Sequence, residues 1–313
     1  MPTSCLVTGG AGFIGSHLVR RLLADGHRVA VLDDLSTGKR ENLAEVAADV
    51  RLVVGDLRDA AACRDALAGC ELVFHLAARG SVPRSLADPL GTHDVNVNGT
   101  VTLLEAARAA GARRVVFASS SSAYGDTPTL PKVETMEPLP RSPYAASKLS
   151  AEQYVLAWAR GGLLEGVALR YFNIFGPRQD PAGPYAAVIP RWMQAARDGG
   201  VATVLGDGGQ TRDFTYVDNA VEANVLAATR PADAVSGWVM NCGAGARTSL
   251  LELLASIEAA AGRPVRREHA PSRAGDVRDS LASLERARER LGYAPSVDVG
   301  EGIRRTWSAF TAA

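Results

Sequence analysis

Short apolar runs alternate with segments of helical periodicity along the first half of the chain. Residues 4–8 are predicted to form a buried strand, and apolar residues at helical spacing follow from Gly12 to Ala24. Because the apolar runs are continuous rather than alternating, we expect strands that are buried on both faces. Further runs of this kind predict strands at 28–32, 51–54, 72–76, 115–118 and 167–171, with helical segments between most of them.

This order of elements predicts an α/β fold with a doubly wound parallel sheet of the Rossmann type. The pattern changes after Asn173, where loops rich in Gly, Pro and Asp, the first at 176–184, separate short and irregular elements. We therefore expect a Rossmann domain at 1–173 and mainly a smaller α+β lobe at 174–313. The two are expected to be intertwined, because segments at about 211–241 are predicted to return to the Rossmann domain.

The composition is that of an ordinary globular protein of 313 residues, 47% of them hydrophobic and 22% charged. Lys plus Arg number 34, as do Asp plus Glu, so the formal net charge is zero. Such a chain has no bulk attraction to nucleic acid or to an anionic membrane surface, and we expect neither partner. The first strand starts too early for a signal peptide, and the longest apolar runs are too short to span a bilayer. We expect a cytoplasmic protein.

The four cysteines, Cys5, Cys63, Cys70 and Cys242, have spacing that fits no metal-binding or redox motif. We expect them to be reduced and to serve as small buried side chains. No metal site is predicted.

The sequence VTGGAGFIG at 7–15 places Gly9, Gly12 and Gly15 between the first predicted strand and the first predicted helix. Glycine there allows a tight turn, a close approach of the backbone to a pyrophosphate, and close packing of the helix on the strand. The N-terminus of the helix adds unpaired N–H groups that bind phosphate. A tight turn alone would also explain the glycines, but their strand–turn–helix context favours a dinucleotide-binding site.

The second predicted strand leads into Asp33, about 20 residues after the glycines, which is the spacing of dinucleotide-binding motifs. A carboxylate at this place accepts hydrogen bonds from ribose hydroxyls and repels a 2′-phosphate. Asp34 adds to the repulsion, so the sequence predicts NAD rather than NADP; a turn or helix-capping role for Asp33 is the alternative. Asp56 and Leu57 follow the third strand and are expected near the adenine.

Ser142 and Pro143 favour the start of a helix on which Tyr144 and Lys148, four residues apart, share one face. The Lys148 ammonium and an oxidised nicotinamide would each favour the tyrosinate. We therefore expect the pKa of Tyr144 to be lowered, which would make it a general base. A Tyr-x-x-x-Lys pair is common on helix surfaces, and the preceding dinucleotide motif is what favours catalysis here.

Four serines at 119–122 follow the strand predicted at 115–118, at the end of the strand where open α/β sheets bind ligands. A serine at this place can hydrogen-bond a reacting hydroxyl and relay its proton. The alternative is a set of polar turn residues.

Together these residues resemble the extended short-chain dehydrogenase/reductase family from about Cys5 to about Leu291, and within it the UDP-hexose 4-epimerases. The stretches that carry the resemblance are DDLSTG at 33–38, GSVPRS at 80–85, NVNGT at 96–100, LRYFN at 169–173, TRDF at 211–214 and RAGD at 273–276.

The resemblance implies NAD as the cofactor, a UDP sugar as the substrate, and Ser120, Tyr144 and Lys148 as the catalytic residues. Arginine suits a diphosphate because its planar fork forms paired, charge-assisted hydrogen bonds. The implied cofactor contacts are Gly9, Gly12, Phe13, Ile14, Gly15, Asp33, Asp34, Leu35, Ser36, Thr37, Gly38, Asp56, Leu57, Leu76, Ala77, Ala78, Asn96, Ser119, Tyr144, Lys148, Tyr171 and Phe172. The implied substrate contacts are Gly80, Ser81, Ser120, Ser121, Tyr144, Asn173, Ala187, Val188, Thr203, Val204, Leu205, Arg212, Arg273, Asp276 and Ser280.

The implied reaction oxidises and then reduces C4 of the sugar. Tyr144 removes the proton of the C4 hydroxyl as hydride leaves C4, the 4-keto sugar turns over in the site, and hydride returns to its opposite face. Related dehydratases and decarboxylases carry acidic residues just after the catalytic serine or threonine, where this chain has Ser121 and Ser122. This departure favours epimerisation. The alternatives are a nucleotide-sugar dehydratase or dehydrogenase of the same family, and a non-catalytic dinucleotide sensor.

The identity of the sugar is a finer prediction. A small residue at the position of Ser280, together with the stretches at 80–81 and 185–188, resembles the family members that accept N-acetylated sugars. We expect UDP-N-acetylglucosamine and UDP-N-acetylgalactosamine, UDP-glucose and UDP-galactose, or both pairs. UDP-glucuronic acid is the alternative, for which Arg79 would meet the carboxylate, but we expect Arg79 to point to solvent.

The family resemblance also implies a homodimer. The expected interface is a four-helix bundle to which each subunit contributes helices at 92–110 and 143–160.

Overall fold

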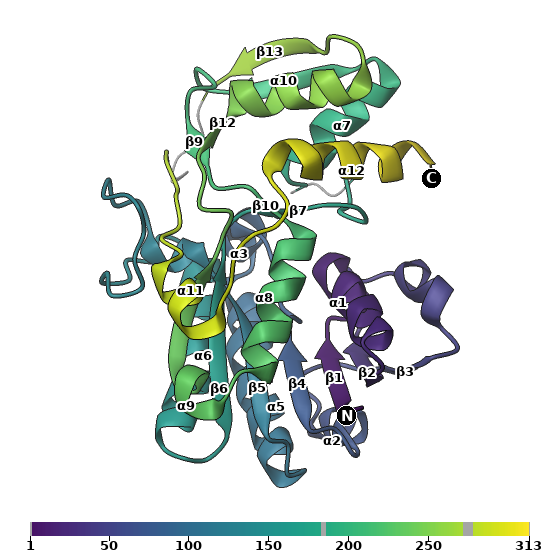
Figure 1. Ribbon diagram of the computed structural model, residues 1–313, viewed down its shortest axis with the longest axis vertical. Helices are drawn as coiled ribbons and strands as arrows, with labels where there is room; N and C mark the ends of the chain where they lie inside the picture. Colours follow the sequence, from purple (N-terminus) through teal and green to yellow (C-terminus); the bar gives the residue numbers. More distant parts are fainter. Residues whose placement is uncertain (1, 183–185, 272–277, 313) are drawn as a thin grey trace.

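We describe the fold from a computed structural model of the chain, which covers residues 2–182, 186–271 and 278–312. Within these residues, seven parallel strands form one sheet with helices on both faces (Figure 1). The chain order reverses between β1 and β4, which confirms the predicted doubly wound, Rossmann-type α/β fold. The strands lie in the order β11 (Trp238–Cys242), β6 (Glu165–Tyr171), β5 (Arg114–Ser120), β4 (Leu72–His75), β1 (Ser4–Thr8), β2 (Arg28–Asp33) and β3 (Val50–Val54).

The side chains of each central strand divide between two apolar cores, one on either face of the sheet. Cys5 and Val7 of β1 belong to one core and Leu6 to the other, and all three are fully buried. This burial on both faces explains why the strands have continuous apolar runs. Helices α1 (Phe13–Ala24) and α8 (Val217–Thr229) cover the first core, and α2 (Ala60–Leu67), α5 (Gly99–Ala109) and α6 (Pro143–Arg160) cover the second.

The observed elements begin and end within a few residues of the predicted ones, except at 92–110. There the chain forms α4 (Pro89–His93), a π-helical turn η2 (Asp94–Asn98) and then α5, rather than one uniform helix. A short helix α3 (Val82–Ala87) precedes them, and Asp88, whose carboxylate accepts from the N–H of Gly91 at 2.9 Å, starts α4. The π-helical turn carries Asn96 to the buried side, where its amide bonds the backbone of Arg79.

A second group of elements lies at the carboxyl end of the main sheet, at the top of Figure 1. Helices α7 (Val188–Asp198), α10 (Leu250–Ala261) and α12 (Val299–Ala312) pack together beside the parallel pair of strands β8 (Val201–Leu205) and β13 (Arg266–Ala270). The other short elements are η1 (Arg40–Val46), η3 (Ser121–Tyr124), β7 (Ile174–Phe175), β9 (Thr211–Arg212), β10 (Thr215–Tyr216), α9 (Ala232–Val235), β12 (Thr248–Ser249) and α11 (Glu285–Leu291).

Two elements from late in the chain return to the main sheet: α8 packs on it and β11 is one of its strands. Helix α8 lies within the segment at about 211–241 that was predicted to return, and β11 lies at the end of that segment. The division of the chain into two domains stays a prediction. All four cysteines are buried and free of disulfides, as predicted. In the part of the chain that the structure describes, no helix is long and apolar enough to cross a membrane, and no cluster of three or more His, Cys, Asp or Glu side chains could hold a metal ion.

Candidate active site

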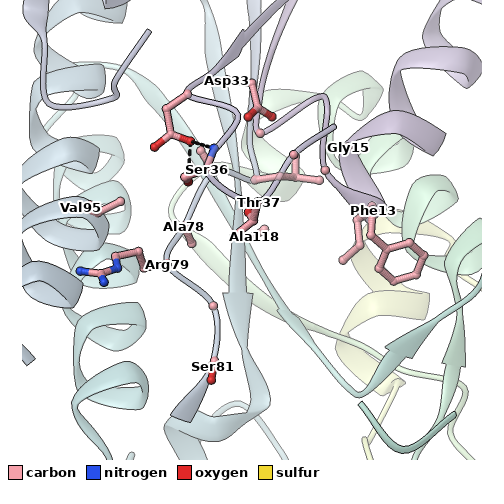
Figure 2. Close-up of a pocket in the computed structure, with 18 of the residues that line it drawn as sticks. Phe13, Gly15, Asp33, Ser36, Thr37, Ala78, Arg79, Ser81, Val95 and Ala118 are labelled. Atoms are coloured by element: carbon pink, nitrogen blue, oxygen red, sulfur yellow. Dashed lines mark hydrogen bonds between the residues drawn. The ribbon is translucent and has the colours of Figure 1, made fainter. Parts of the chain in front are cut away.

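A cavity of about 790 Å³ lies at the carboxyl ends of the main-sheet strands. Its walls come from segments that follow β1 to β6, on both sides of the point where the strand order reverses. Open parallel sheets bind ligands at this point. Figure 2 shows part of the lining, with Asp33 at the end of β2, Ser36 in the loop that follows it, and Arg79 and Ser81 in the loop after β4.

The glycine-rich loop after β1 packs closely on the segment after β4. Gly9 has a φ of 70°, and a Cβ on it would come within 2.8 Å of the backbone nitrogen of Ala77. A Cβ on Gly15 would overlap the carbonyl oxygen of Gly9. Among the described residues no side chain caps helix α1 at Gly12, so the first N–H groups of α1 remain available to a phosphate.

The carboxylate of Asp33 is held in place by two backbone hydrogen bonds. The N–H groups of Ala11 and Leu35 donate to its two oxygens, each at 2.9 Å, and a Cβ on Gly38 would come within 2.6 Å of the carboxylate. Burial raises the pKa of Asp33 despite these bonds. Asp34 accepts from the N–H of Ser36 at 2.9 Å and from its hydroxyl at 2.7 Å, as Figure 2 marks at Ser36. A bare glycine loop, an uncapped helix end and a fixed carboxylate fit the pyrophosphate and ribose of an adenine dinucleotide.

Helix α6 begins as predicted and brings Tyr144 and Lys148 to the cavity. The N–H of Ala145 donates to the hydroxyl of Ser142 at 3.1 Å, which caps the helix one residue before Pro143. Tyr144 and Lys148 both line the cavity. Burial lowers the pKa of Lys148 to about 7, although the carboxylate of Glu152 on the same helix acts to raise it.

The pKa of Tyr144 does not follow the sequence-based expectation. Burial raises it, and a side-chain hydrogen bond with Ser120 only partly opposes this rise. The prediction of a lowered pKa for Tyr144 was therefore wrong for the chain without its cofactor. The prediction counted the charge of Lys148 but not the loss of water around the phenol.

The four serines at 119–122, at the end of β5 and directly after it, have different surroundings. Ser119 lines the cavity. The hydroxyl oxygen of Ser120 accepts from the N–H of Ser122 at 3.2 Å and from the Ser122 hydroxyl at 2.8 Å. Because Ser120 accepts both bonds, its own proton is left to donate toward Tyr144. Ser120 and Ser121 are half-buried and are not part of the cavity lining described above.

Most of the residues predicted to contact the cofactor do line this cavity. Asn96 and Phe172 do not line it. The side-chain amide of Asn96 forms hydrogen bonds with the hydroxyl of Ser147 and with the backbone of Arg79, and Phe172 is fully buried. The predicted residues that the cavity brings together are Gly9, Gly12, Phe13, Ile14, Gly15, Asp33, Asp34, Leu35, Ser36, Thr37, Gly38, Asp56, Leu57, Leu76, Ala77, Ala78, Ser119, Tyr144, Lys148 and Tyr171. The lining residues that were not predicted as site residues include Leu32, Lys39, Gly55, Arg84, Val95, Ala118, Gln179, Asp180 and Ala186.

Gly80 and Ser81 also line the first cavity, whereas six of the other predicted substrate contacts line a second cavity of about 370 Å³. The two cavities share Gln179, Ala186 and Ala187 and therefore adjoin. The predicted residues that line the second cavity are Asn173, Ala187, Val188, Thr203, Leu205 and Arg212.

Two predicted contacts of the second cavity have other surroundings. Val204 is fully buried, because alternate residues of β8 face opposite sides and its neighbours Thr203 and Leu205 take the cavity side. Ser280 lies behind the lining, where its hydroxyl accepts from the side-chain amide of Asn173 at 3.3 Å and from the N–H of Asp213 at 3.4 Å.

Arg212 lines the second cavity while its guanidinium donates to the carbonyl oxygens of Thr211 at 3.0 Å and Arg278 at 2.7 Å. Arg273 and Asp276, predicted to hold the diphosphate and the uridine ribose, lie outside the described residues.

Arg79 does not point freely to solvent, which corrects the sequence-based expectation. Its guanidinium forms an ion pair of 2.6 Å with Asp88, and the residue lines the first cavity. The side-chain amide of Asn96 bonds the N–H and the carbonyl oxygen of Arg79 and holds the start of this segment in place.

The comparisons with known proteins agree with this geometry. Residues 5–243 match the model of the NAD dependent epimerase/dehydratase family. A UDP-glucose 4-epimerase of Mycolicibacterium smegmatis is 45% identical over 314 residues, which cover 97% of each chain. The solved UDP-N-acetylglucosamine 4-epimerase of Methanobrevibacter ruminantium, in complex with UDP-N-acetylmuramic acid, has a TM-score of 0.93 and 37% identity, with 99% of each chain covered. A UDP-glucose 4-epimerase of Thermus thermophilus in complex with NAD has a TM-score of 0.90 and 39% identity, covering 99% of this chain and 100% of that one.

These likenesses extend over nearly the whole chain and well beyond the glycine-rich loop. They agree with the independent fit of the first cavity to an adenine dinucleotide, so NAD is the cofactor. The chain belongs to the NAD dependent epimerase/dehydratase family.

Proposed function

We propose that the chain inverts C4 of a UDP sugar through a transient 4-keto sugar. The chain is an NAD-dependent epimerase, and the proposal concerns its substrate and the residues that act on it. The main support for this proposal is that the two cavities adjoin each other at Gln179, Ala186 and Ala187. A ligand held by its nucleotide beside Arg212 would place its sugar toward Tyr144.

Tyr144 is the group that moves the proton. Its phenolate removes the proton of the C4 hydroxyl, and the ammonium of Lys148 balances the charge of the phenolate. Ser120, whose oxygen accepts two hydrogen bonds from Ser122, donates its own proton to the reacting oxygen and orients it. NAD, when bound, supplies a hydride acceptor that returns the hydride to the sugar.

The second cavity is proposed to hold the UDP while the sugar turns over. Asn173 and Arg212 line this cavity and are suited to a diphosphate, because amide and guanidinium groups donate to its oxygens. These contacts with the diphosphate are remote from the reacting carbon, so the sugar can rotate without leaving the site.

The placement of carboxylates favours epimerisation over elimination of water. Asp33, Asp34 and Asp56 line the first cavity from the ends of β2 and β3, and β1 and β4 separate those strands from the serines at the end of β5. The fourth carboxylate of the lining, Asp180, is paired with Lys39. Beside Ser120 the chain has Ser122, whose hydroxyl cannot serve readily as the acid or base that a dehydratase needs at C5 and C6.

We infer that N-acetylated sugars are accepted. The small Ser280 lies directly behind Asn173, where a large aromatic residue would press on the second cavity, and the relative from Methanobrevibacter ruminantium is bound to an N-acetylated sugar nucleotide. UDP-glucuronic acid is the second candidate, because two arginines, Arg79 and Arg84, line the first cavity near Ser81.

A proton NMR assay of C4 configuration with a panel of UDP sugars tests the proposed function. We expect interconversion of UDP-N-acetylglucosamine and UDP-N-acetylgalactosamine, no net formation of NADH, and abolished turnover in Tyr144→Phe with NAD still bound. Turnover of UDP-glucose without turnover of the N-acetylated sugars would remove the proposed sugar. Net accumulation of NADH would indicate a dehydrogenase instead.

We also propose that the chain forms a homodimer. The proposed surface keeps the predicted helix at 143–160, which is α6, and replaces most of the predicted helix at 92–110 with α3 and α4. Leu86 and Leu90 are 65% and 82% exposed, and Tyr154 on α6 is 44% exposed. Helices α3 and α4 both pack against α6, so these side chains come from adjoining elements. Exposed apolar residues on adjoining helices are typical of a protein–protein interface.

A further inference from the structure

Behind the wall of the first cavity lies a buried ion pair that the proposed chemistry does not use. The guanidinium of Arg170 on β6 donates to both carboxylate oxygens of Glu152 on α6, at 2.9 and 2.7 Å. Glu152 is 0% exposed and Arg170 is 2% exposed. A buried ion pair often stabilises a fold no more than apolar residues of similar volume would, so stability alone does not account for it.

Glu152 reaches the cavity through two residues of its lining. The hydroxyl of Ser119, near the end of β5, donates to Glu152 at 2.6 Å. Lys148 lies one helical turn before Glu152 and therefore on the same face of α6. Lys148 is 3% exposed, and its ammonium lies 4.3 Å from the centre of the Phe117 ring.

The titratable groups around Lys148 differ in the charge that they carry near neutral pH. Burial lowers the pKa of His75 on β4 to about 3, so His75 is neutral. Burial raises the pKa of Tyr144, so without NAD this phenol adds no negative charge beside Lys148. The carboxylate of Glu152, which is paired with Arg170, raises the pKa of Lys148 against the effect of burial. Among the described residues, Glu152 is therefore the group that favours the ammonium form of Lys148.

We propose that Glu152 is a positioning residue of this active site, whose carboxylate keeps Lys148 in its ammonium form while Arg170 and Ser119 hold that carboxylate still. Arg170 donates hydrogen bonds to both carboxylate oxygens of Glu152. The ammonium of Lys148 therefore remains at the cavity wall and does not form a direct ion pair with Glu152. The inference rests on the proposed role of Lys148 as the electrostatic partner of Tyr144.

The charge of Lys148 can be measured without substrate. The chain has three lysines, Lys39, Lys132 and Lys148, so labelling lysine with ¹³C at the ε carbon gives three signals, of which Lys148→Met identifies one. Glu152→Gln removes the charge of Glu152 and keeps its size. We expect this variant to lower the midpoint of the Lys148 titration by about one pH unit, a tenfold loss of ammonium at a fixed pH above that midpoint.

The same change should appear in the pH profile of turnover. If the active form needs Lys148 protonated, its loss of a proton sets the alkaline limb of kcat, and Glu152→Gln moves that limb to lower pH with little change in KM. Glu165→Gln is the matched control. Glu165 also pairs with a buried arginine, Arg114, at 2.7 Å, but this pair lies at the amino ends of β5 and β6, away from the cavity. We expect this control to lose stability and to keep both the Lys148 midpoint and the alkaline limb.

Glu152→Gln also leaves Arg170 buried without its partner, and the double variant Glu152→Gln/Arg170→Gln removes that complication. We expect its Lys148 midpoint to stay below that of the unchanged chain. A midpoint that does not move in Glu152→Gln, or one that the double variant restores, would overturn the proposal, since Glu152 would then serve only to neutralise Arg170. Because the NMR midpoint needs no sugar, an inactive UDP-sugar panel would overturn the proposed function and leave this result standing.

Discussion

The ammonium of Lys39 and the carboxylate of Asp180 form an ion pair of 2.9 Å between two loops that both line the first cavity. One loop follows β2 and the other follows β7, so the pair joins segments 141 residues apart in the sequence. The N–H of Lys39 also donates to the carbonyl oxygen of Ala11 at 3.0 Å, which ties the first loop to the glycine-rich loop. Both charged side chains are about half exposed, at 55% and 45%, so the ion pair lies on the solvent side of the cavity.

Breaking this ion pair should speed the release of NAD without changing the chemistry. Exposed ion pairs contribute little free energy, so we expect Asp180→Asn to release NAD roughly two- to fivefold faster, with kcat unchanged. Fluorescence after dilution of NADH-loaded protein into excess NAD measures the rate. The swapped variant Lys39→Asp/Asp180→Lys should return the rate toward its original value, and equal rates in all three proteins would show that the pair does not retain the cofactor.

A methyl group at Gly15 should disrupt the cofactor loop. The Cβ of Gly15→Ala would overlap the carbonyl oxygen of Gly9 and come within 2.8 Å of the Cα of Gly10, and neither backbone atom can move aside alone. We expect a loss of about 1–3 kcal/mol in the free energy of unfolding, together with weaker binding of NAD. Urea unfolding and calorimetric titration measure the two effects. Gly200→Ala is the control, because its Cβ would meet Ala195 at an ordinary 3.4 Å.

The parts of the site that the sequence predicted are those encoded by neighbouring residues. The glycine-rich loop, Asp33 and the Tyr144–Lys148 pair each combine a recognisable residue type with a strand or helix boundary only a few residues away. Such local patterns fix both the element and the direction in which the side chain points. The main sheet was predictable for a related reason, since strands buried on both faces leave continuous apolar runs.

The parts that the sequence did not predict depend on tertiary packing. Gln179 and Asp180 reach the cavity from a loop far along the chain, and no pattern in their own segment marks them. The π-helical turn that buries Asn96 is hidden within a periodicity that a uniform helix would also produce. The raised pKa of Tyr144 follows from burial, which spacing along a helix does not report.

Removing the charge of Lys148 should stabilise the fold in a pH-dependent way. The pKa of Lys148 is about 7 in the folded chain, against 10.5 as its ordinary value. The unfolded chain therefore binds more protons between these two pH values, and stability rises with pH across this window. Below pH 7 the burial of the charge costs its full amount, roughly 5 kcal/mol at one pKa unit per 1.36 kcal/mol.

We accordingly expect Lys148→Met to be inactive and yet more stable than the unchanged chain at pH 6, with the difference shrinking toward pH 10. Urea unfolding of both proteins after removal of NAD measures this difference. Lys39→Met, at an exposed site, should show no comparable change with pH. A stability gain that is the same at pH 6 and pH 10 would mean that packing, and not charge, limits the stability of this helix.

An acidic residue at Leu90 should separate the proposed dimer into monomers. Leu90 on α4 is 82% exposed, and in a twofold interface each substitution occurs twice. Loss of two buried leucine side chains costs about 3 kcal/mol or more, which raises the dissociation constant at least a hundredfold. Sedimentation velocity at micromolar concentration should find a dimer for the unchanged chain and a monomer for Leu90→Asp. Leu139→Asp, at a loop residue that is 49% exposed, should remain a dimer; a monomeric unchanged chain, or an unaffected Leu90→Asp, would rule out an interface at this surface.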